Sequence, residues 1–214
     1  MNIIFDLDGT VVDSKLRLYR LFQALAPESG LSFEEYWALK KNGTSNRTIL
    51  SAYLGYDEAQ NQAFDTKWMS LIETPFFLSL DRNFGGIHNA LRMLRIQADL
   101  HVCTSRQLRE LAIEQLAHLG LLPHLTQVMV TEQKHAKREL ILKHIPNLSH
   151  TDWMVGDTGN DIQVGRSLNL KTCGVLTGFL SKEALTGYEP DLIVDSVPAF
   201  SALLTSNAIL TQGG

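Results

Sequence analysis

Two acidic residues near the start of this 214-residue chain have the type and spacing that could do chemistry. Asp6 and Asp8 directly follow the apolar run 2–5, and Gly9 comes next. Residues two apart on an extended segment point the same way, roughly 6–7 Å apart along the chain, so both carboxylates should face one small volume. Gly9 then allows the chain to turn away tightly. The segment therefore predicts paired carboxylates at the end of a buried strand.

Further polar residues are expected at the same edge, because ligands of open α/β sheets bind at the carboxyl ends of the strands. Asp157 and Asp161 follow the apolar run 153–155, and their spacing of four residues would place both on one face of a helix. The other polar residues expected there are Thr104, Ser105 and Arg106 after a second strand, and Lys137 at the start of a helix.

Four carboxylates at one edge cannot crowd together cheaply, because like charges raise one another's pKa values. A hard divalent cation resolves this conflict, and oxygen-only ligands without a nearby histidine or cysteine favour Mg²⁺ over zinc. A metal ion together with a lysine and hydroxyl donors is what a transferring phosphoryl group requires, since catalysis there is mostly positioning and charge neutralisation. We therefore expect Mg²⁺-dependent phosphoryl transfer at this edge.

The elements that must position these residues are short strands buried on both faces. Each apolar run is too short and too continuous for an amphipathic helix, which favours a parallel sheet. The runs are 2–5, 100–103, 127–130, 153–155 and, more weakly, 172–176. Segments with helical period alternate with them, at 87–94, 108–119, 138–144 and 161–168. The alternation predicts an α/β fold with a doubly wound, parallel-sheet, Rossmann-like core.

Residues 15–82 break this alternation and predict an inserted α-helical domain. No buried-strand run occurs there, and glycines separate the helical segments 15–25, 32–40, 45–54 and 58–71. Ser32 and Glu35 have the spacing of a capping box at the start of one of them. The predicted domains are thus a catalytic core of residues 1–14 and 83–214, and a helical domain of residues 15–82.

The order of these segments resembles the four motifs of the haloacid dehalogenase-like superfamily. The matching residues are Asp6-Leu7-Asp8-Gly9-Thr10, Thr104, Lys137 and the run Gly156-Asp157-x-x-x-Asp161. The most similar group is the phosphatases that carry a helical cap after the first motif, such as phosphoglycolate phosphatases, and Asp13-Ser14 resembles the hinge into that cap. The resemblance implies hydrolysis of a small-molecule phosphate monoester.

The resemblance also implies a role for each matching residue. Asp6 would be the nucleophile that forms an aspartyl-phosphate, and Asp8 would be the general acid and then the general base. The implied Mg²⁺ ligands are Asp6, Asp157 and the backbone carbonyl of Asp8, with Asp161 holding a metal-bound water or orienting Lys137. The groups implied to hold phosphoryl oxygens are Thr104, Lys137 and the amides of Gly9 and Ser105.

Three assignments depend on less specific patterns. Lys137 is preferred to Lys134 as the motif lysine because a helix opens directly after it, as it would after the family lysine, although the family's usual lysine-proline pair is missing. Arg106 is assigned to the substrate phosphate, the alternative being a solvated surface cation. Arg47 is the best candidate for substrate contact in the basic loop 40–47, the alternative being an ordinary helix–helix turn.

Other functions remain open at this point. A phosphomutase of the β-phosphoglucomutase type would use the same intermediate with a sugar hydroxyl as acceptor. A dehalogenase is disfavoured because such enzymes lack the second acid, and phosphonate cleavage because the first motif does not match that branch. A non-catalytic binding protein on the same fold would show no turnover on any substrate.

Composition narrows the class of protein. The net charge of −4 gives no bulk attraction to nucleic acid or to an anionic membrane, and no apolar run approaches the ~18 residues of a membrane span. Cys103 and Cys173 lie in apolar runs without metal-ligand spacing, as expected of reduced thiols, and no signal peptide is visible. We expect a cytoplasmic monomer or homodimer whose partner is a small phosphorylated substrate.

Overall fold

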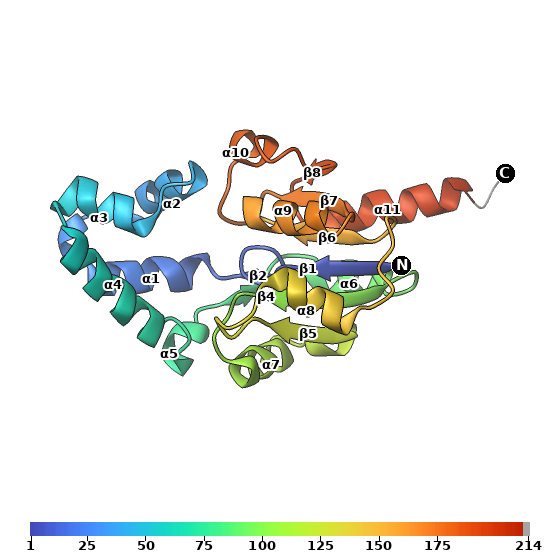
Figure 1. Cartoon of the computed structure of the whole chain (residues 1–214), viewed down its shortest axis with the longest axis horizontal. Coiled ribbons are helices and arrows are strands. Elements are labelled where there is room, and N and C mark those ends of the chain that lie inside the picture. Colours follow the sequence, from blue (N-terminus) through green and yellow to red (C-terminus); the bar gives the residue numbers. More distant parts are fainter. Residues whose placement is uncertain (212–214) are drawn as a thin grey trace.

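Six parallel strands form the central sheet, in the order β5-β4-β1-β6-β7-β8. The computed structural model describes the backbone of residues 1–211 and the side chains of residues 1–206. The strands are β1 (Asn2–Phe5), β4 (Asp99–Thr104), β5 (Gln127–Val130), β6 (Trp153–Gly156), β7 (Lys171–Val175) and β8 (Leu192–Val194). Because β1 lies between β4 and β6, its carboxyl end is in the middle of the sheet edge, beside the ends of both neighbours (Figure 1).

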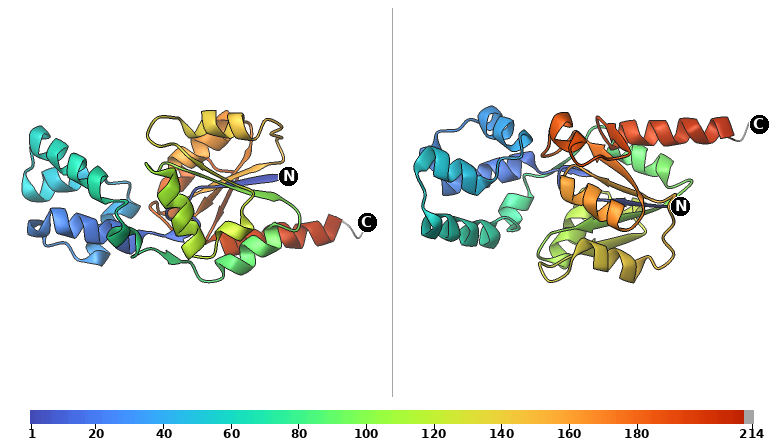
Figure 2. Two further views of the ribbon diagram at one scale, coloured as in Figure 1. Left: turned by 90° about the horizontal axis from the view of Figure 1, so that it is seen from below. Right: turned by 45° about the horizontal axis from the view of Figure 1, so that its top comes forward.

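Helices cover both faces of this sheet (Figures 1 and 2). They are α6 (Ile87–Leu94), α7 (Arg109–His118), α8 (Lys137–His144), α9 (Gly159–Ser167), α10 (Lys182–Thr186) and α11 (Val197–Thr211), with the 3-10 turn η2 (Leu122–His124). Neighbouring strand residues point to opposite faces, so Ile3 and Phe5 pack with α6, α7 and α11, whereas Ile4 packs with α8 and α9. Both faces are apolar, which explains the continuous apolar runs in the sequence.

A helical body follows the first strand and has an apolar core of its own, separate from that of the sheet (Figure 2). Its elements are α1 (Lys15–Leu25), the 3-10 turn η1 (Pro27–Ser29), α2 (Phe33–Lys41), α3 (Asn46–Leu54), α4 (Glu58–Leu71) and α5 (Pro75–Leu78). Aromatic rings dominate its core; Phe22 lies between Tyr36 and Phe64, with ring centroids 4.7 and 6.1 Å away. We call this body the cap.

The two chain crossings between cap and sheet lie side by side. β2 (Val12–Asp13) leads into α1, β3 (Arg82–Asn83) returns from α5, and the two pair in antiparallel fashion, with Val12 opposite Asn83 and Asp13 opposite Arg82. Both crossings are therefore joined in one two-stranded ribbon, and the residues that flank it are brought close together.

The predicted α/β fold with a parallel sheet is confirmed, and the capping box at α2 is present, with Ser32 N 2.8 Å from Glu35 Oε2 and Glu35 N 3.2 Å from Ser32 Oγ. The sequence analysis missed the short strands β2, β3 and β8 and the helices α5, α10 and α11. Among the described residues, no helix combines the length and the apolar character needed to cross a membrane.

Candidate active site

The segment after β1 places Asp6 and Asp8 at the middle of the sheet edge. The Asp6 amide continues the sheet by donating to the Val155 carbonyl at 2.9 Å. The chain then reverses at Gly9, whose φ of +84° is in the left-handed region and whose amide donates to Val12 O at 2.8 Å. After this tight turn, both carboxylates lie at the carboxyl end of β1 and line one cavity, as their spacing of two residues predicts.

Three buried carboxylates meet at this edge. Asp6, Asp157 and Asp161 each offer an oxygen atom, and these atoms all lie within 4.8 Å of one another. Burial raises the pKa of Asp6 to about 7, with Lys137 opposing and Asp161 adding to the rise. Burial also raises the pKa of Asp157 well above its ordinary value, and Asp6 and Asp161 add to this rise. Three acids forced together in this way form a site that a cation would stabilise.

Lys137 is the cation that the structure places inside this group. Its Nζ lies 2.6 Å from Asp6 Oδ1 and 2.7 Å from Asp161 Oδ1, and it is buried at the first residue of α8. Burial lowers the pKa of Lys137, but Asp161 and Asp6 outweigh burial, so the pKa is raised and the group stays charged. Lys134 is exposed on the loop before α8 and has no contact with the triad among the described hydrogen bonds and ion pairs.

Short polar contacts fix the orientation of the other two carboxylates. Asp157 Oδ1 accepts from Thr10 Oγ1 at 3.0 Å, and its Oδ2 accepts from the Phe179 amide at 2.7 Å. Asp161 Oδ2 accepts from the hydroxyl and the amide of Thr158 at 2.6 and 3.3 Å. The sequence analysis missed these three donors; the position of Thr158 three residues before Asp161 is the only local signal, that of a helix cap.

Asp8 faces a different set of partners. Its Oδ2 accepts from Arg106 Nε at 2.9 Å, and its Oδ1 accepts from Arg106 Nη2 at 2.8 Å and from Arg17 Nη2. Burial raises the pKa of Asp8, but Arg106 and then Arg17 outweigh burial, so the pKa is held well below its ordinary value. Arg106, predicted at the phosphate, thus contacts Asp8 in this structure, and it is buried rather than a solvated surface cation.

Arg17 was missed by the sequence analysis, although a signal for it exists. It precedes the buried Leu21 of α1 by four residues, so a charged side chain lies on the apolar face of the helix. Arg47, predicted at the substrate, lies elsewhere: it pairs with Asp65 at 2.6 Å and with Glu58 at 2.7 Å in the cap, and it is not among the residues that line the cavity.

A cavity of about 280 Å³ opens between the cap and the sheet edge. Its floor is polar and its cap side largely apolar. The lining residues are Asp6, Asp8, Thr104, Ser105, Arg106, Gln107, Gln133, Lys137, Thr158 and Asn160 from the core, and Arg17, Leu18, Trp68, Met69, Ile72 and Glu73 from the cap, with Phe179. Thr104 and Ser105 thus line the same cavity as Asp6, at the sheet edge where the sequence predicts them.

The acidic triad could hold a hard divalent cation. All its donors are carboxylate oxygens, which Mg²⁺ and Ca²⁺ prefer and zinc does not. Burial is the largest cause of the raised pKa values of Asp6 and Asp157, and the neighbouring carboxylates add to the rise, so a bound cation would favour the ionised forms. The site therefore combines an acidic triad that could hold a metal ion, a buried ammonium group and a separate carboxylate, Asp8, which lines the cavity.

Residues 3–175 match the model of a family described as haloacid dehalogenase-like hydrolase. The chain belongs to this family. A plasmid-borne phosphoglycolate phosphatase of Cupriavidus necator is 31% identical over 216 residues, which is 95% of this chain and 92% of the relative. A pyrophosphatase of Oceanobacillus iheyensis is 22% identical over 204 residues, 92% of each.

A solved structure of a haloacid dehalogenase-like hydrolase from Streptococcus pneumoniae has the same fold. The TM-score is 0.79 at 19% identity, over 95% of this chain and 97% of that chain. The predicted membership of the haloacid dehalogenase-like hydrolases is thus confirmed, and so is the α/β fold class.

Proposed function

We propose that this haloacid dehalogenase-like hydrolase is a Mg²⁺-dependent phosphatase that hydrolyses a small phosphate monoester through an aspartyl-phosphate on Asp6. The observation that carries the proposal is the position of Asp6: it belongs to the acidic triad, contacts Lys137 at 2.6 Å and lines the cavity. Two relatives with phosphatase and pyrophosphatase names support the same class of chemistry. In this proposal residues 1–14 and 83–214 are the catalytic core and residues 15–82 the cap.

The metal would be held by the carboxylates of Asp6 and Asp157 and by the backbone carbonyl of Asp8, with Asp161 holding a metal-bound water or Lys137. When bound, Mg²⁺ supplies charge neutralisation at the phosphoryl oxygens. Lys137, whose Nζ lies 2.6 Å from Asp6 Oδ1, would supply a second positive charge. Thr104 Oγ1 and the amides of Gly9 and Ser105 would donate to the remaining oxygens.

The reaction has two steps that the chain's own residues perform. Asp6 would form a bond to phosphorus while the bond from phosphorus to the leaving oxygen breaks, and Asp8, which the structure shows paired with Arg106 and Arg17, would have to take up a proton before it could give one to that oxygen. Water then attacks phosphorus and loses a proton to Asp8, the bond to Asp6 breaks, and inorganic phosphate leaves. Asp6 ends as a free carboxylate and Asp8 is protonated again, so that the cycle is balanced.

The size and lining of the cavity support a small substrate. A volume of about 280 Å³ suits a small metabolite, and its cap side offers an apolar wall with Leu18, Trp68 and Met69. Phosphoglycolate and pyrophosphate, the compounds in the names of the relatives, are the first substrates to test.

The test is release of inorganic phosphate from a panel of phosphorylated metabolites with and without Mg²⁺. We expect turnover that excess EDTA abolishes and that Asp6→Asn reduces to background. Asp195→Asn, at an exposed position of the core, is the matched control and should keep full activity. Undiminished turnover of Asp6→Asn would contradict the nucleophile, activity in EDTA would contradict the metal, and conversion of a hexose 1-phosphate to its isomer would favour the mutase.

A further inference from the structure

The loop 176–181 between β7 and α10 contacts the acidic triad on its core side. Thr177 Oγ1 donates to the Gly9 carbonyl at 2.6 Å, and the Phe179 amide donates to Asp157 Oδ2 at 2.7 Å. A Cβ on Gly178 would overlap the same Asp157 oxygen, so a glycine is needed for the backbone to approach this closely. The loop thus holds one carboxylate of the triad by direct backbone contact.

The other side of the same loop packs against the cap. The centroid of the Phe179 ring lies 5.5 Å from that of Trp37 in α2, and Phe179 packs against the aromatic core of the cap. The Ser181 amide donates to the carbonyl of Lys41, the last residue of α2, at 2.9 Å. Figure 1 shows the chain between β7 and α10 on the side of the sheet that faces the cap. Phe179 therefore belongs to the core domain by sequence and to the apolar core of the cap by packing.

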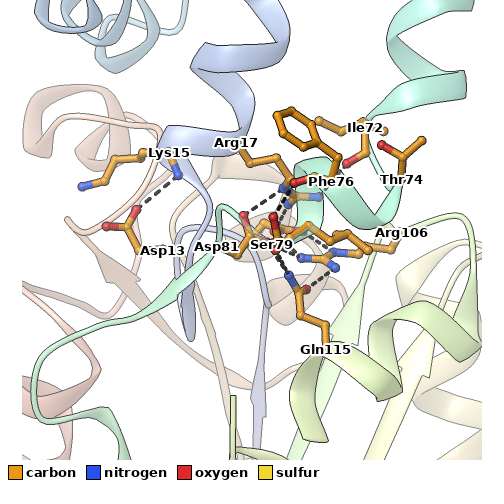
Figure 3. A network of polar contacts seen from close by, with 12 residues as sticks. Asp13, Lys15, Arg17, Ile72, Thr74, Phe76, Ser79, Asp81, Arg106 and Gln115 are labelled. Carbon is orange, nitrogen blue, oxygen red and sulfur yellow. Dashed lines mark hydrogen bonds and ion pairs between the residues drawn. The ribbon is translucent and has the colours of Figure 1, made fainter. Parts of the chain in front are cut away.

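A different attachment of the cap lies beside the two chain crossings and is polar. Arg17 Nε lies 3.0 Å from Asp81 Oδ1, and Arg106 Nη2 lies 3.2 Å from Asp81 Oδ2 (Figure 3). Arg17 is in the first turn of α1 and Asp81 directly precedes β3, so both residues are next to the crossings in sequence. The loop 176–181 belongs to neither crossing, so its contact with the cap depends on how the cap sits on the core.

We propose that Phe179 is a positioning residue that couples the seat of the cap to the acidic triad. The proposal rests on the proposed function, in which Asp157 is a metal ligand. When the Phe179 ring is held against Trp37, the amide of the same residue is fixed where it donates to Asp157. The carboxylate is then oriented before a cation arrives, as outer contacts orient metal ligands in other proteins.

Such coupling works in both directions, because the two events share one thermodynamic cycle. If the seated cap raises the affinity of the triad for Mg²⁺ by some factor, then Mg²⁺ must favour the seated cap by the same factor. Trp37 is a suitable residue to test this, because it is not among the residues that line the cavity and lies in the cap. Its buried indole N–H has no hydrogen-bond partner among the described residues, so it meets Phe179 through ring packing.

The experiment is Mg²⁺ titration of the full chain by calorimetry, without substrate. We expect Phe179→Ala and Trp37→Leu each to weaken Mg²⁺ binding by about 5- to 20-fold, at the lower end of the usual range for coupling between sites. The double variant should lose no more than about twofold beyond the larger single loss, because both substitutions break one contact. Tyr53→Ala, at an exposed aromatic residue of the cap, is the matched control and should bind Mg²⁺ as the wild type does.

Calorimetry reports the binding-competent fraction as the stoichiometry, so a partly misfolded variant does not imitate a weaker affinity. Wild-type affinity in both single variants, or a loss in Phe179→Ala alone, would overturn the coupling to the cap. A double variant whose loss is the product of the two single losses would overturn it as well. Absence of Mg²⁺ binding to the wild-type chain would instead contradict the metal of the proposed function, so the two failures are distinguishable.

The reverse direction is measured by amide hydrogen exchange at Ser181, whose N–H is bonded to the cap at Lys41. Saturating Mg²⁺ should slow this exchange in the wild type by about the factor by which Phe179→Ala weakens Mg²⁺ binding, and should change it by less than about twofold in Phe179→Ala. Exchange at Ser181 that is equally fast with and without Mg²⁺ in the wild type would contradict the coupling.

Discussion

Lys137 Nζ lies 2.6 Å from Asp6 Oδ1, and the same ammonium group joins Asp6 to Asp161 at 2.7 Å. A buried cation in this place would offset the negative charge of a phosphoryl group that approaches Asp6. We predict that Lys137→Ala lowers kcat/KM by about 10²- to 10³-fold, the usual loss when one preorganised electrostatic group is removed. Lys134→Ala, three residues earlier and exposed, should stay within about twofold.

Steady-state phosphate release with saturating Mg²⁺ measures this pair of variants, with circular dichroism to confirm that both are folded. A loss confined to Lys134→Ala would reverse the assignment of the motif lysine.

A comparison of Gly9→Ala with Gly55→Ala distinguishes the cost of backbone strain from an effect on the proposed metal site. A Cβ on Gly9 would lie 2.6 Å from Asp157 Oδ2, whereas a Cβ on Gly55 would meet nothing within 4 Å, and both residues have positive φ. Both alanine variants should therefore lose about 1 kcal/mol or somewhat more of unfolding free energy. Only Gly9→Ala should also bind Mg²⁺ more weakly, by about 10- to 100-fold, because Asp157 must move.

Urea unfolding and Mg²⁺ titration by calorimetry measure the two effects separately. Equal Mg²⁺ affinity in Gly9→Ala and Gly55→Ala would show that Asp157 is not a ligand or that its position is adjustable.

The effect of pH on Mg²⁺ binding follows from the raised pKa of Asp6. This pKa is about 7 in the folded metal-free protein against an ordinary 3.8, so the folded state binds more protons than the unfolded state between these values. Asp6 therefore lowers the stability of the metal-free protein as pH rises from about 4 to about 7. Mg²⁺ displaces the proton, so its apparent affinity should fall about tenfold per pH unit below 7 for one displaced proton.

The thermal shift caused by a fixed MgCl₂ concentration should accordingly be larger at about pH 8 than at about pH 6. Calorimetry in two buffers of different ionisation enthalpy counts the released protons. No proton release at pH 6 would mean that the cation binds away from Asp6.

Glu73 provides a contact between cap and core whose loss should affect stability. Its carboxylate accepts from the Gln107 amide at 2.7 Å and from the Leu108 amide at 3.1 Å, at the start of α7. A negative charge at a helix N-terminus is favourable, and Glu73→Gln should lower the free energy of unfolding by about 1 kcal/mol. Glu114→Gln, exposed on α7 itself, is the control and should change it little. A Glu73→Gln variant as stable as the control would contradict this contribution.

Much of the fold could be predicted because the parallel sheet is buried on both faces. The strand 2–5, for example, is apolar at successive residues since α6 and α11 cover one face and α8 the other. β8 was missed because an apolar run of three residues is too short to indicate a strand. The helix α11 was missed because the polar residues in the sequence 197–211 are spread among the apolar ones without helical period, so no amphipathic pattern reveals it.

The residues of the site likewise fall into those that the sequence could predict and those that it could not. Asp6, Asp157 and Asp161 follow strands whose carboxyl ends share one sheet edge, and their predicted meeting is found. Asp8 was expected in the same cluster, but it pairs with Arg106 and Arg17 instead. The pairing of Arg17 with Asp81 joins residues 64 positions apart, and it exists because β2 and β3 bring both ends of the cap together. No local pattern contains that information. Arg47 illustrates the opposite case: its basic loop resembled a substrate loop, but nearby acids in the cap bind it.

The central claim is that Asp6 carries the phosphoryl group, and covalent trapping tests it most directly. The enzyme is mixed with Mg²⁺ and ³²P-labelled substrate, quenched with acid within the first turnover, digested, and analysed by mass spectrometry. The account predicts an acid-stable, hydroxylamine-labile label on the peptide that contains Asp6, and no label in Asp6→Asn. A label on another residue, or phosphate release without any labelled protein at a rate that trapping can resolve, would contradict it.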